Sequence, residues 1–251
     1  MQHFAEHATE LGLTLSSEQC LRFEQYAAAL AEWNERFNLT TITEPAQVET
    51  HHFLDSLSAL PVLAAVQSLK LPALLTSTPT AIDVGTGAGL PGLALKLVWP
   101  GLQLTLLEGT GKKVTFLEHM IQLYGLSGVR AVHGRAEELA GHAPWREGFD
   151  LVLARAVAPL PILLEYLLPL ARVDGWILAY KGAVPQVDAE LTASGDAITQ
   201  LGGQLISVQA LQVPGLHERR SLIVVRKVKP TPRAFPRASG VIRKRPLGSS
   251  Q

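Results

Sequence analysis

The residues best suited to chemistry lie in the segment 81–92, which reads Ala-Ile-Asp-Val-Gly-Thr-Gly-Ala-Gly-Leu-Pro-Gly. An apolar run ends at Asp83, and three glycines follow at Gly85, Gly87 and Gly89. Pro91 stands where a helix can begin, because the first helical turn has no use for the missing N–H. The pattern predicts a strand, a tight loop and a helix start, an arrangement that brings backbone N–H groups close to a nucleotide-like ligand.

Two nucleotide ligands compete for this loop. The spacing Gly87-x-Gly89-x-x-Gly92 satisfies the dinucleotide fingerprint, which is a weak signal alone. A carboxylate at Asp83 would repel the pyrophosphate of NAD, whereas it would favour the cationic sulfonium and ammonium groups of S-adenosylmethionine. The segment therefore favours a methyl donor. A turn that needs glycine only for its backbone shape is the non-functional alternative.

A second acid supports a nucleoside site. The run 102–108 reads as the next strand and ends in Glu108, 23 residues after Gly85. A carboxylate at this position can accept hydrogen bonds from ribose hydroxyls. Both NAD and S-adenosylmethionine carry that ribose, so Glu108 does not separate the two. A solvated acid at a strand end is the alternative.

Composition narrows the class of protein. The chain has 251 residues, 47% of them hydrophobic, enough for one large domain or a domain with an appendage. No apolar run reaches the roughly 18 residues that span a bilayer, and no signal peptide is apparent. Cys20 is the only cysteine, which excludes an intrachain disulfide and fits a reducing cytoplasm. No cluster has the spacing of zinc ligands, so we expect no metal.

The net charge of zero hides a strong asymmetry. Residues 219–251 contain 10 Lys and Arg and no Asp or Glu, whereas residues 1–218 contain 12 Lys and Arg against 22 Asp and Glu. A basic end on an acidic body indicates an acidic partner, most often nucleic acid. Four prolines interrupt this end, so we expect it to be extended rather than helical. A solvated tail without a partner is the alternative.

The remaining chain predicts an α/β organisation. Residues 1–78 look helical, with one helix over 17–37 and a second that begins at Pro45 and runs through Leu57. Residues 71–79 read as a linker. Strand-like runs at 80–84, 102–108, 129–133, 149–154 and 175–180 alternate with helical runs at 91–98, 112–124, 136–140 and 159–171. A helix at 185–201 precedes two strands, 204–211 and 220–228, which we expect to pair antiparallel.

Several motifs in order give the chain a family resemblance. They are 83–92, Gly111-Lys-Lys-Val-Thr-Phe-Leu117, Ala154-Arg-Ala-Val-Ala-Pro-Leu160, Asn38-Leu-Thr40, His52-Phe-Leu-Asp-Ser56, Ala179-Tyr-Lys-Gly182, Lys229-Pro-Thr-Pro-Arg233, Phe235-Pro-Arg237 and Arg245-Pro-Leu247. The core resembles the class I S-adenosylmethionine-dependent methyltransferases. Over nearly the whole chain it resembles the small-subunit ribosomal RNA guanine-N7 methyltransferases, also known as glucose-inhibited division protein B. One departure is Glu108-Gly109 in place of the usual Asp-Ser.

The resemblance implies a fold and an activity. The fold would be Rossmann-like, a seven-stranded, mostly parallel sheet with helices on both faces. The predicted segments are an N-terminal helical extension (1–78), a methyltransferase core (79–229) and a basic, proline-containing tail (230–251). The activity would be methyl transfer from S-adenosylmethionine to N7 of a guanine in the 530-loop region of 16S ribosomal RNA.

The family also implies a cofactor contact set. Asp83, the loop glycines and Leu90 would lie at the methionine end, Glu108 at the ribose, Ala136 and Glu137 at the adenine, and Arg155 where cofactor and base meet. Glu137 has an alternative role in stabilising a helix start. Arg155 could instead be a surface ion-pair partner, although its predicted place at the carboxyl end of a strand favours the site.

Missing residues narrow the methyl acceptor. Methylation of pyrimidine carbon 5 needs a thiolate nucleophile, and Cys20 lies in the N-terminal helical segment. Exocyclic amine methylation commonly uses an Asn/Asp-Pro-Pro-aromatic motif, where this chain has Ala154-Arg-Ala-Val. A ring nitrogen such as guanine N7 remains, and it needs no general base. We therefore name no catalytic residue.

The predicted partner is 16S ribosomal RNA in the small ribosomal subunit. Basic residues that would contact its phosphates are Lys112, Lys181, Arg233, Arg237, Arg243, Lys244 and Arg245. Nothing in the sequence suggests an obligate dimer, so we expect a monomer. The alternatives are an NAD(P)-dependent oxidoreductase and an RNA-binding protein with an inactive core.

Overall fold

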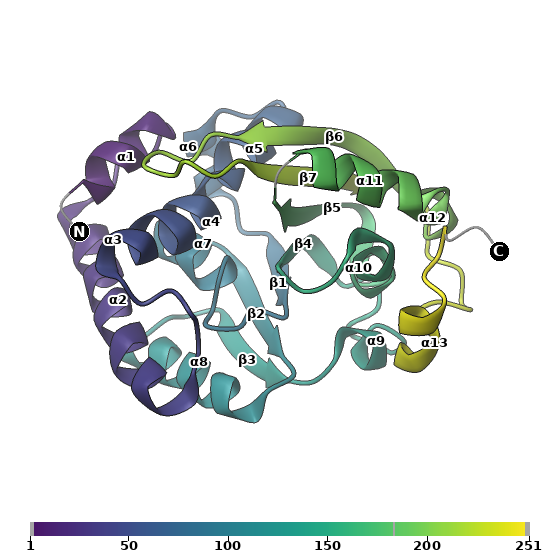
Figure 1. Ribbon diagram of the computed structural model, residues 1–251, viewed down its shortest axis with the longest axis horizontal. Helices are drawn as coiled ribbons and strands as arrows, with labels where there is room; N and C mark the ends of the chain where they lie inside the picture. Colours follow the sequence, from purple (N-terminus) through teal and green to yellow (C-terminus); the bar gives the residue numbers. More distant parts are fainter. Residues whose placement is uncertain (1–2, 183, 249–251) are drawn as a thin grey trace. The chain divides into compact units, whose positions relative to one another are not determined.

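The computed structural model describes residues 3–182 and 184–248 (Figure 1). Within these residues the strands form one seven-stranded sheet in the order β3-β2-β1-β4-β5-β7-β6. The strands are β1 (Thr80–Val84), β2 (Gln103–Glu108), β3 (Val129–His133), β4 (Phe149–Arg155), β5 (Ala171–Lys181), β6 (Gly203–Leu211) and β7 (Arg220–Lys227). The pairs β1–β4, β2–β3 and β4–β5 are parallel, and β7 is antiparallel to both β5 and β6. The predicted α/β fold with an antiparallel last pair is confirmed.

The chain divides into two compact units, each assembled from separate parts of the sequence. The first comprises residues 1–78, 85–133 and 212–218, and the second comprises residues 79–84, 134–211 and 219–251. The sequence predicts three consecutive segments instead, and that division stays a prediction.

The helices of the first unit are mostly N-terminal. They are α1 (Phe4–Glu10), α2 (Ser17–Phe37), α3 (Pro45–Gln47), the π-helix η1 (Val48–Leu54), α4 (Asp55–Leu57), α5 (Ala59–Val66), α6 (Leu71–Thr76), α7 (Gly92–Val98) and α8 (Gly111–Leu123). The helix predicted over 17–37 is confirmed. Ser16 and Gln19 begin it with a capping box, and Asn38 ends it in the left-handed conformation. The helical run predicted from Pro45 is also present, with a π-helical turn in its middle.

The linker predicted over 71–79 is wrong, because α6 occupies most of it. Pro72 lies in the first turn of α6, where proline is tolerated. Leu74 is buried and gives this short helix an apolar anchor. Just after it, the backbone carbonyl of Ser77 accepts a hydrogen bond of 2.9 Å from the indole N–H of Trp99. The buried contacts of this segment favour a helix, although its prolines predicted a linker.

The second unit contains five helices among its described residues. They are α9 (Ala136–Leu139), α10 (Leu160–Leu167), α11 (Val184–Ser194), α12 (Ala197–Gln200) and α13 (Ser239–Lys244). The single helix predicted over 185–201 is thus two, α11 and α12. The basic end is not wholly extended, because α13 forms between Pro236 and Pro246 and packs on α10. Its Ile242 is fully buried, which explains why a helix forms there.

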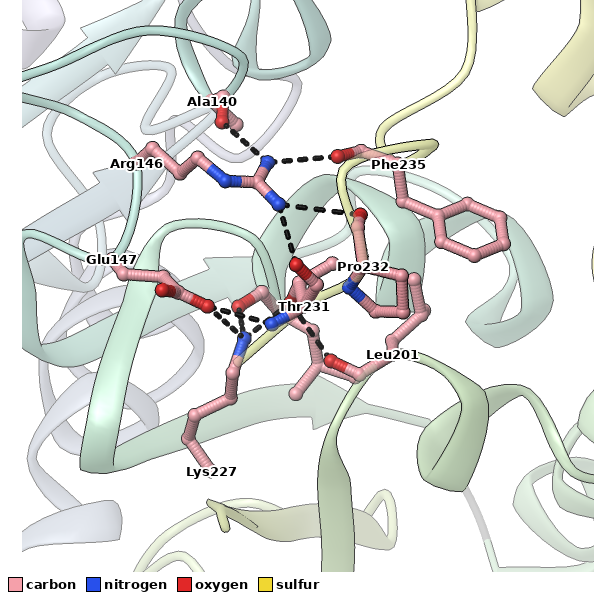
Figure 2. A network of polar contacts seen from close by, with 9 residues as sticks. Ala140, Arg146, Glu147, Leu201, Lys227, Thr231, Pro232 and Phe235 are labelled. Carbon is pink, nitrogen blue, oxygen red and sulfur yellow. Dashed lines mark hydrogen bonds and ion pairs between the residues drawn. The ribbon is translucent and has the colours of Figure 1, made fainter. Parts of the chain in front are cut away.

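The chain that follows β7 is held by a polar network around Arg146 (Figure 2). The Arg146 guanidinium donates hydrogen bonds to the backbone carbonyls of Thr231 and Phe235, at 2.6 and 2.7 Å. The neighbouring Glu147 accepts one of 2.6 Å from the backbone N–H of Thr231. The predicted tail therefore begins as a bound part of the second unit.

Lys227 lies at the centre of the same network, with its side chain fully buried. Its ammonium group donates to the Leu168 carbonyl at 2.7 Å and to the Thr231 hydroxyl, and it lies 3.3 Å from the Glu147 carboxylate. Burial lowers the pKa of Lys227 to about 8, although Glu147 partly opposes the shift. A buried cation with these partners is satisfied, but its desolvation remains costly.

This burial predicts a pH dependence of stability. The folded pKa lies below the unfolded value of about 10.4, so the protonated side chain destabilises the fold, and that cost disappears as pH rises between these values. From about pH 7.5 to about pH 9.5, the unfolding free energy of the wild type should rise by about 2 kcal/mol relative to Lys227→Met. Denaturant titrations measure it. The exposed control Lys229→Met should show no such trend, and a constant difference for Lys227→Met would contradict the assignment.

Candidate functional site

The glycine loop of the first unit, residues 85–92, is a tight turn. Gly85, Gly87 and Gly89 all have positive φ angles, of 66°, 60° and 91°, a region that other residues rarely adopt. The predicted helix start is confirmed, because Pro91 caps α7 at its N-terminus. The glycines at these positions are therefore required by the backbone.

The N–H groups of the loop are directed inward. Those of Gly85 and Thr86 donate to the carbonyl of Leu107 in β2, at 2.8 and 3.2 Å. Those of Gly89 and Leu90 donate to the carbonyl of Thr86, both at 2.9 Å. The first two bonds fix the loop against the end of β2, and the last two close the loop on itself. The approach of loop N–H groups to a ligand stays a prediction.

Glu108 joins the glycine loop to the start of α8. One carboxylate oxygen accepts a hydrogen bond of 2.9 Å from the Gly87 N–H, and the other accepts one of 2.9 Å from the Thr110 N–H. The residue is buried, with 7% of its surface exposed. A carboxylate has about four acceptor positions. Glu108 can therefore accept further hydrogen bonds from a ligand beside the loop.

Gly87 has open space in front of its α-carbon. A Cβ atom built there would meet nothing within 4 Å. At Gly89, by contrast, a Cβ would lie 2.6 Å from the Tyr26 hydroxyl. The open side of the loop is thus at Gly87, whose N–H is bound to Glu108. Leu90 is buried, with 6% of its surface exposed.

Four predicted site residues belong to the second unit. Asp83 is fully buried near the carboxyl end of β1 and pairs in register with Leu153 of β4. Arg155 is half-buried at the carboxyl end of β4. Ala136 and Glu137 form the first turn of α9, the former buried and the latter half-buried. Each occupies the end of a strand or the start of a helix, as predicted.

The segment after β4 is constrained. Ala156, directly after Arg155, has a φ of 56°, which is strained for a residue with a side chain. Lys181 donates to the Ala158 carbonyl at 2.8 Å and pairs with Glu190 at 2.6 Å. Glu190 also accepts a 2.6 Å bond from the Leu160 N–H. The contacts of Lys181 thus hold this loop, a role that its prediction as a phosphate ligand did not include.

The predicted RNA-binding residues divide into two groups. Lys112 in the first unit, and Arg233, Arg243, Lys244 and Arg245 in the second, are exposed. Arg237 is instead bound to the fully buried Glu165 by charge-assisted hydrogen bonds of 2.6–3.1 Å. This hydrogen bonding raises the pKa of Arg237. Its guanidinium fastens the chain between β7 and α13, as Arg146 does further upstream.

Sequence reasoning missed two supporting residues. Glu190 and Tyr26 contact the segments that carry the predicted site residues, but they lie in other parts of the sequence. Tyr26 was not singled out among the residues of the helix predicted over 17–37. The one available signal was its phenol, since a buried tyrosine hydroxyl usually finds a hydrogen-bond partner.

Among the residues that the structure describes, no group of His, Cys, Asp and Glu side chains is arranged to hold a metal ion. Within the same residues, no helix has the length and apolar character needed to cross a bilayer.

Solved structures resemble this fold at low sequence identity. A crystal structure of MtNAS in complex with MTA and tNA matches 85% of this chain and 78% of its own, with a TM-score of 0.53 and 16% identity. The branched-chain polyamine synthase from Thermus thermophilus matches 70% of this chain and 56% of its own, with a TM-score of 0.52 and 14% identity. These likenesses concern the fold alone.

Sequence comparison is far more specific. The family model GidB, described as rRNA small subunit methyltransferase G, matches residues 19–223. The ribosomal RNA small subunit methyltransferase G of Roseiflexus castenholzii is 44% identical, covering 98% of this chain and 100% of its own length. That of Desulforamulus reducens is 40% identical, covering 96% and 95%. The chain therefore belongs to the family of ribosomal RNA small subunit methyltransferases G.

Proposed function

We propose that this protein transfers a methyl group from S-adenosylmethionine to N7 of a guanine in the 530-loop region of 16S ribosomal RNA. Family membership supports the reaction class and the kind of RNA. The observation that carries the cofactor site is the open side of Gly87 beside the Glu108 carboxylate. An adenosine ribose placed there would find an acceptor already fixed by two backbone bonds.

The acid residues fit a cationic cofactor better than a dinucleotide. Glu108 would hold the ribose hydroxyls through its remaining acceptor positions. The buried carboxylate of Asp83 would favour the sulfonium and ammonium charges and would oppose a pyrophosphate. We propose that Ala136 and Glu137 contact the adenine and that Arg155 lies near the base. The bound cofactor would supply an electrophilic methyl group.

The chemistry asks little of the protein beyond positioning. Guanine N7 has a free lone pair, so no proton has to be removed before it attacks in line with the departing sulfur. Proximity and orientation then supply most of the acceleration. We therefore assign no residue as a general base. Glu190 and Lys181 hold the loop after Arg155, and we assign them a positioning role.

The exposed cations are the proposed RNA contacts. Lys112, Arg233, Arg243, Lys244 and Arg245 are exposed and would contact phosphates from the surface, although the Arg243 side chain also forms a hydrogen bond with Tyr166. Lys181 and Arg237 would act through the segments they fasten. We further propose a cytoplasmic monomer, because its substrate would be ribosomal RNA and no sequence feature indicates an obligate dimer.

A transfer assay tests the reaction. Incubation with methyl-labelled S-adenosylmethionine and small-subunit ribosomal RNA, naked or within subunits, should place the label on guanine N7 at one site. Nuclease digestion and nucleoside mapping locate it. Absence of label on every RNA would overturn the methyltransferase proposal, and label at another atom would overturn the N7 assignment. Binding of NAD without transfer would favour an oxidoreductase.

Gly87 offers a test of the cofactor site. A glutamine at position 87 would project into the open space beside Glu108, so Gly87→Gln should weaken S-adenosylmethionine binding by about a hundredfold or more, through exclusion and loss of the Glu108 contact. Calorimetry measures the Kd. Gly125→Gln is the matched control, since Gly125 follows the C-terminal end of α8, has a φ of 57° and has equally open surroundings. Equal affinities in both variants would refute the loop assignment.

The end of the chain offers a test of RNA binding. Deleting residues 230–251 would also remove Thr231 and Arg237, which form hydrogen bonds with Glu147 and Glu165 in the rest of the second unit, so charge reversal is the cleaner change. The double variant Lys244→Glu/Arg245→Glu should raise the Kd for ribosomal RNA about tenfold or more at low salt, with the Kd for cofactor unchanged. Filter binding measures it, with exposed Lys70→Glu as control. Unaltered RNA affinity would remove these residues from the interface.

A further inference from the structure

The glycine loop is also fastened from the N-terminal helices. The Tyr26 hydroxyl on α2 donates a hydrogen bond of 2.5 Å to the backbone carbonyl of Ala88, between Gly87 and Gly89. Tyr26 is fully buried, and Ala88 is 6% exposed. These residues belong to the first unit, and α2 packs against both α7 and α8. The contact joins sequence positions 62 residues apart.

The ring that carries this hydroxyl is itself held firmly. Its centroid lies 5.1 Å from that of Phe53, in the π-helix η1. Phe53 lies 5.0 Å from Phe23, which packs 4.7 Å from Phe4 of α1. These rings are fully buried or nearly so. The phenol therefore projects from a rigid aromatic cluster made by three N-terminal helices.

Gly89 makes the approach of the hydroxyl possible. A Cβ at this position would lie 2.6 Å from the Tyr26 oxygen, closer than such atoms normally come. Any side chain there would push the hydroxyl away from the loop. Gly89 is thus required both by its φ of 91° and by the space that Tyr26 occupies.

The loop is consequently held at two places. On one side, Leu107 and Glu108 bind the N–H groups of Gly85, Thr86 and Gly87. On the other, Tyr26 binds the carbonyl of Ala88. Without the second bond, the Ala88 peptide group would gain freedom that cofactor binding must then remove. A preformed loop binds more tightly because that ordering is already complete.

We infer that Tyr26 is a positioning residue for the cofactor site, so that the N-terminal helices set the shape of the glycine loop rather than serving only as an appendage. The inference rests on the proposed function, since it assigns the loop to S-adenosylmethionine. It predicts that removing one buried oxygen atom outside the site changes cofactor affinity while leaving RNA affinity alone.

The test is Tyr26→Phe, compared with Tyr124→Phe. The Tyr124 hydroxyl also donates to a backbone carbonyl of α2, that of Arg22 at 2.7 Å, so each variant loses one similar hydrogen bond. Tyr26→Phe should raise the KM and Kd for S-adenosylmethionine about three- to tenfold, with the KM for RNA unchanged. Tyr124→Phe should leave all three near the wild-type values.

A double-variant cycle links the effect to Gly89. Gly89→Ala should weaken cofactor binding strongly in the wild type and less so in Tyr26→Phe, where the 2.6 Å contact is gone. Independent effects of the two changes would contradict the inference. So would wild-type affinity in Tyr26→Phe, or equal losses in both tyrosine variants.

Amide hydrogen exchange separates this inference from the proposed function. Exchange of the loop amides at residues 87–90 should quicken in Tyr26→Phe and not in Tyr124→Phe, even without cofactor. If wild-type protein binds no S-adenosylmethionine, the proposed function fails, yet faster exchange would still show that Tyr26 holds the loop. Unchanged exchange of these amides in Tyr26→Phe would by itself overturn the positioning role.

Discussion

The carboxylate of Glu108 is the constraint on which the described site depends. It accepts hydrogen bonds from the N–H groups of Gly87 and Thr110. These bonds join the glycine loop, the end of β2 and the N-terminal cap of α8. The side chain reaches from the end of β2 to the loop and keeps its remaining acceptor positions. A single buried acid can thus act both as a structural clamp and as a ligand group, provided that its bonds to the backbone leave lone pairs free.

Two other acids hold backbone segments through hydrogen bonds in the same way. Glu190 clamps the loop after β4 through Lys181 and Leu160, and Glu165 clamps the chain before α13 through Arg237. In each case an acid fixes a backbone segment that has little regular structure of its own. Backbone groups in such segments need partners as much as those in helices do, and charged side chains supply them at short distances. The segments that carry the proposed site residues are therefore held by side chains from other parts of the chain.

Much of this arrangement was predictable from the sequence, because the periodic spacing of apolar residues predicts strands and helices. The strands β1 to β4, β6 and β7 and the helix α2 follow the predicted bounds closely, whereas β5 begins at Ala171, before its predicted start at 175. The errors occur where tertiary contacts outweigh local signals, as at α6, where buried Leu74 favours a helix among prolines, and at α13, where buried Ile242 does the same. Asp83, Gly87 and Glu108 could be proposed as site residues because their spacing along the chain matches a strand end, a glycine loop and the end of the next strand. Tyr26 and Glu190 were not, since their partners lie far away in sequence and depend on the folded backbone.

The basic C-terminal region has fewer cations to offer than its composition suggests. Arg226 stacks on Trp176 and pairs with Asp174, Lys227 is buried against Glu147, and Arg237 is bound to Glu165. Only cations that displace condensed counterions from a nucleic acid contribute to the salt dependence of its binding. Because these three charges are already engaged within the protein, the number of ions released by RNA would be smaller than a count of lysines and arginines implies. Part of the basic C-terminal region therefore holds the folded chain together and does not add charge for RNA binding.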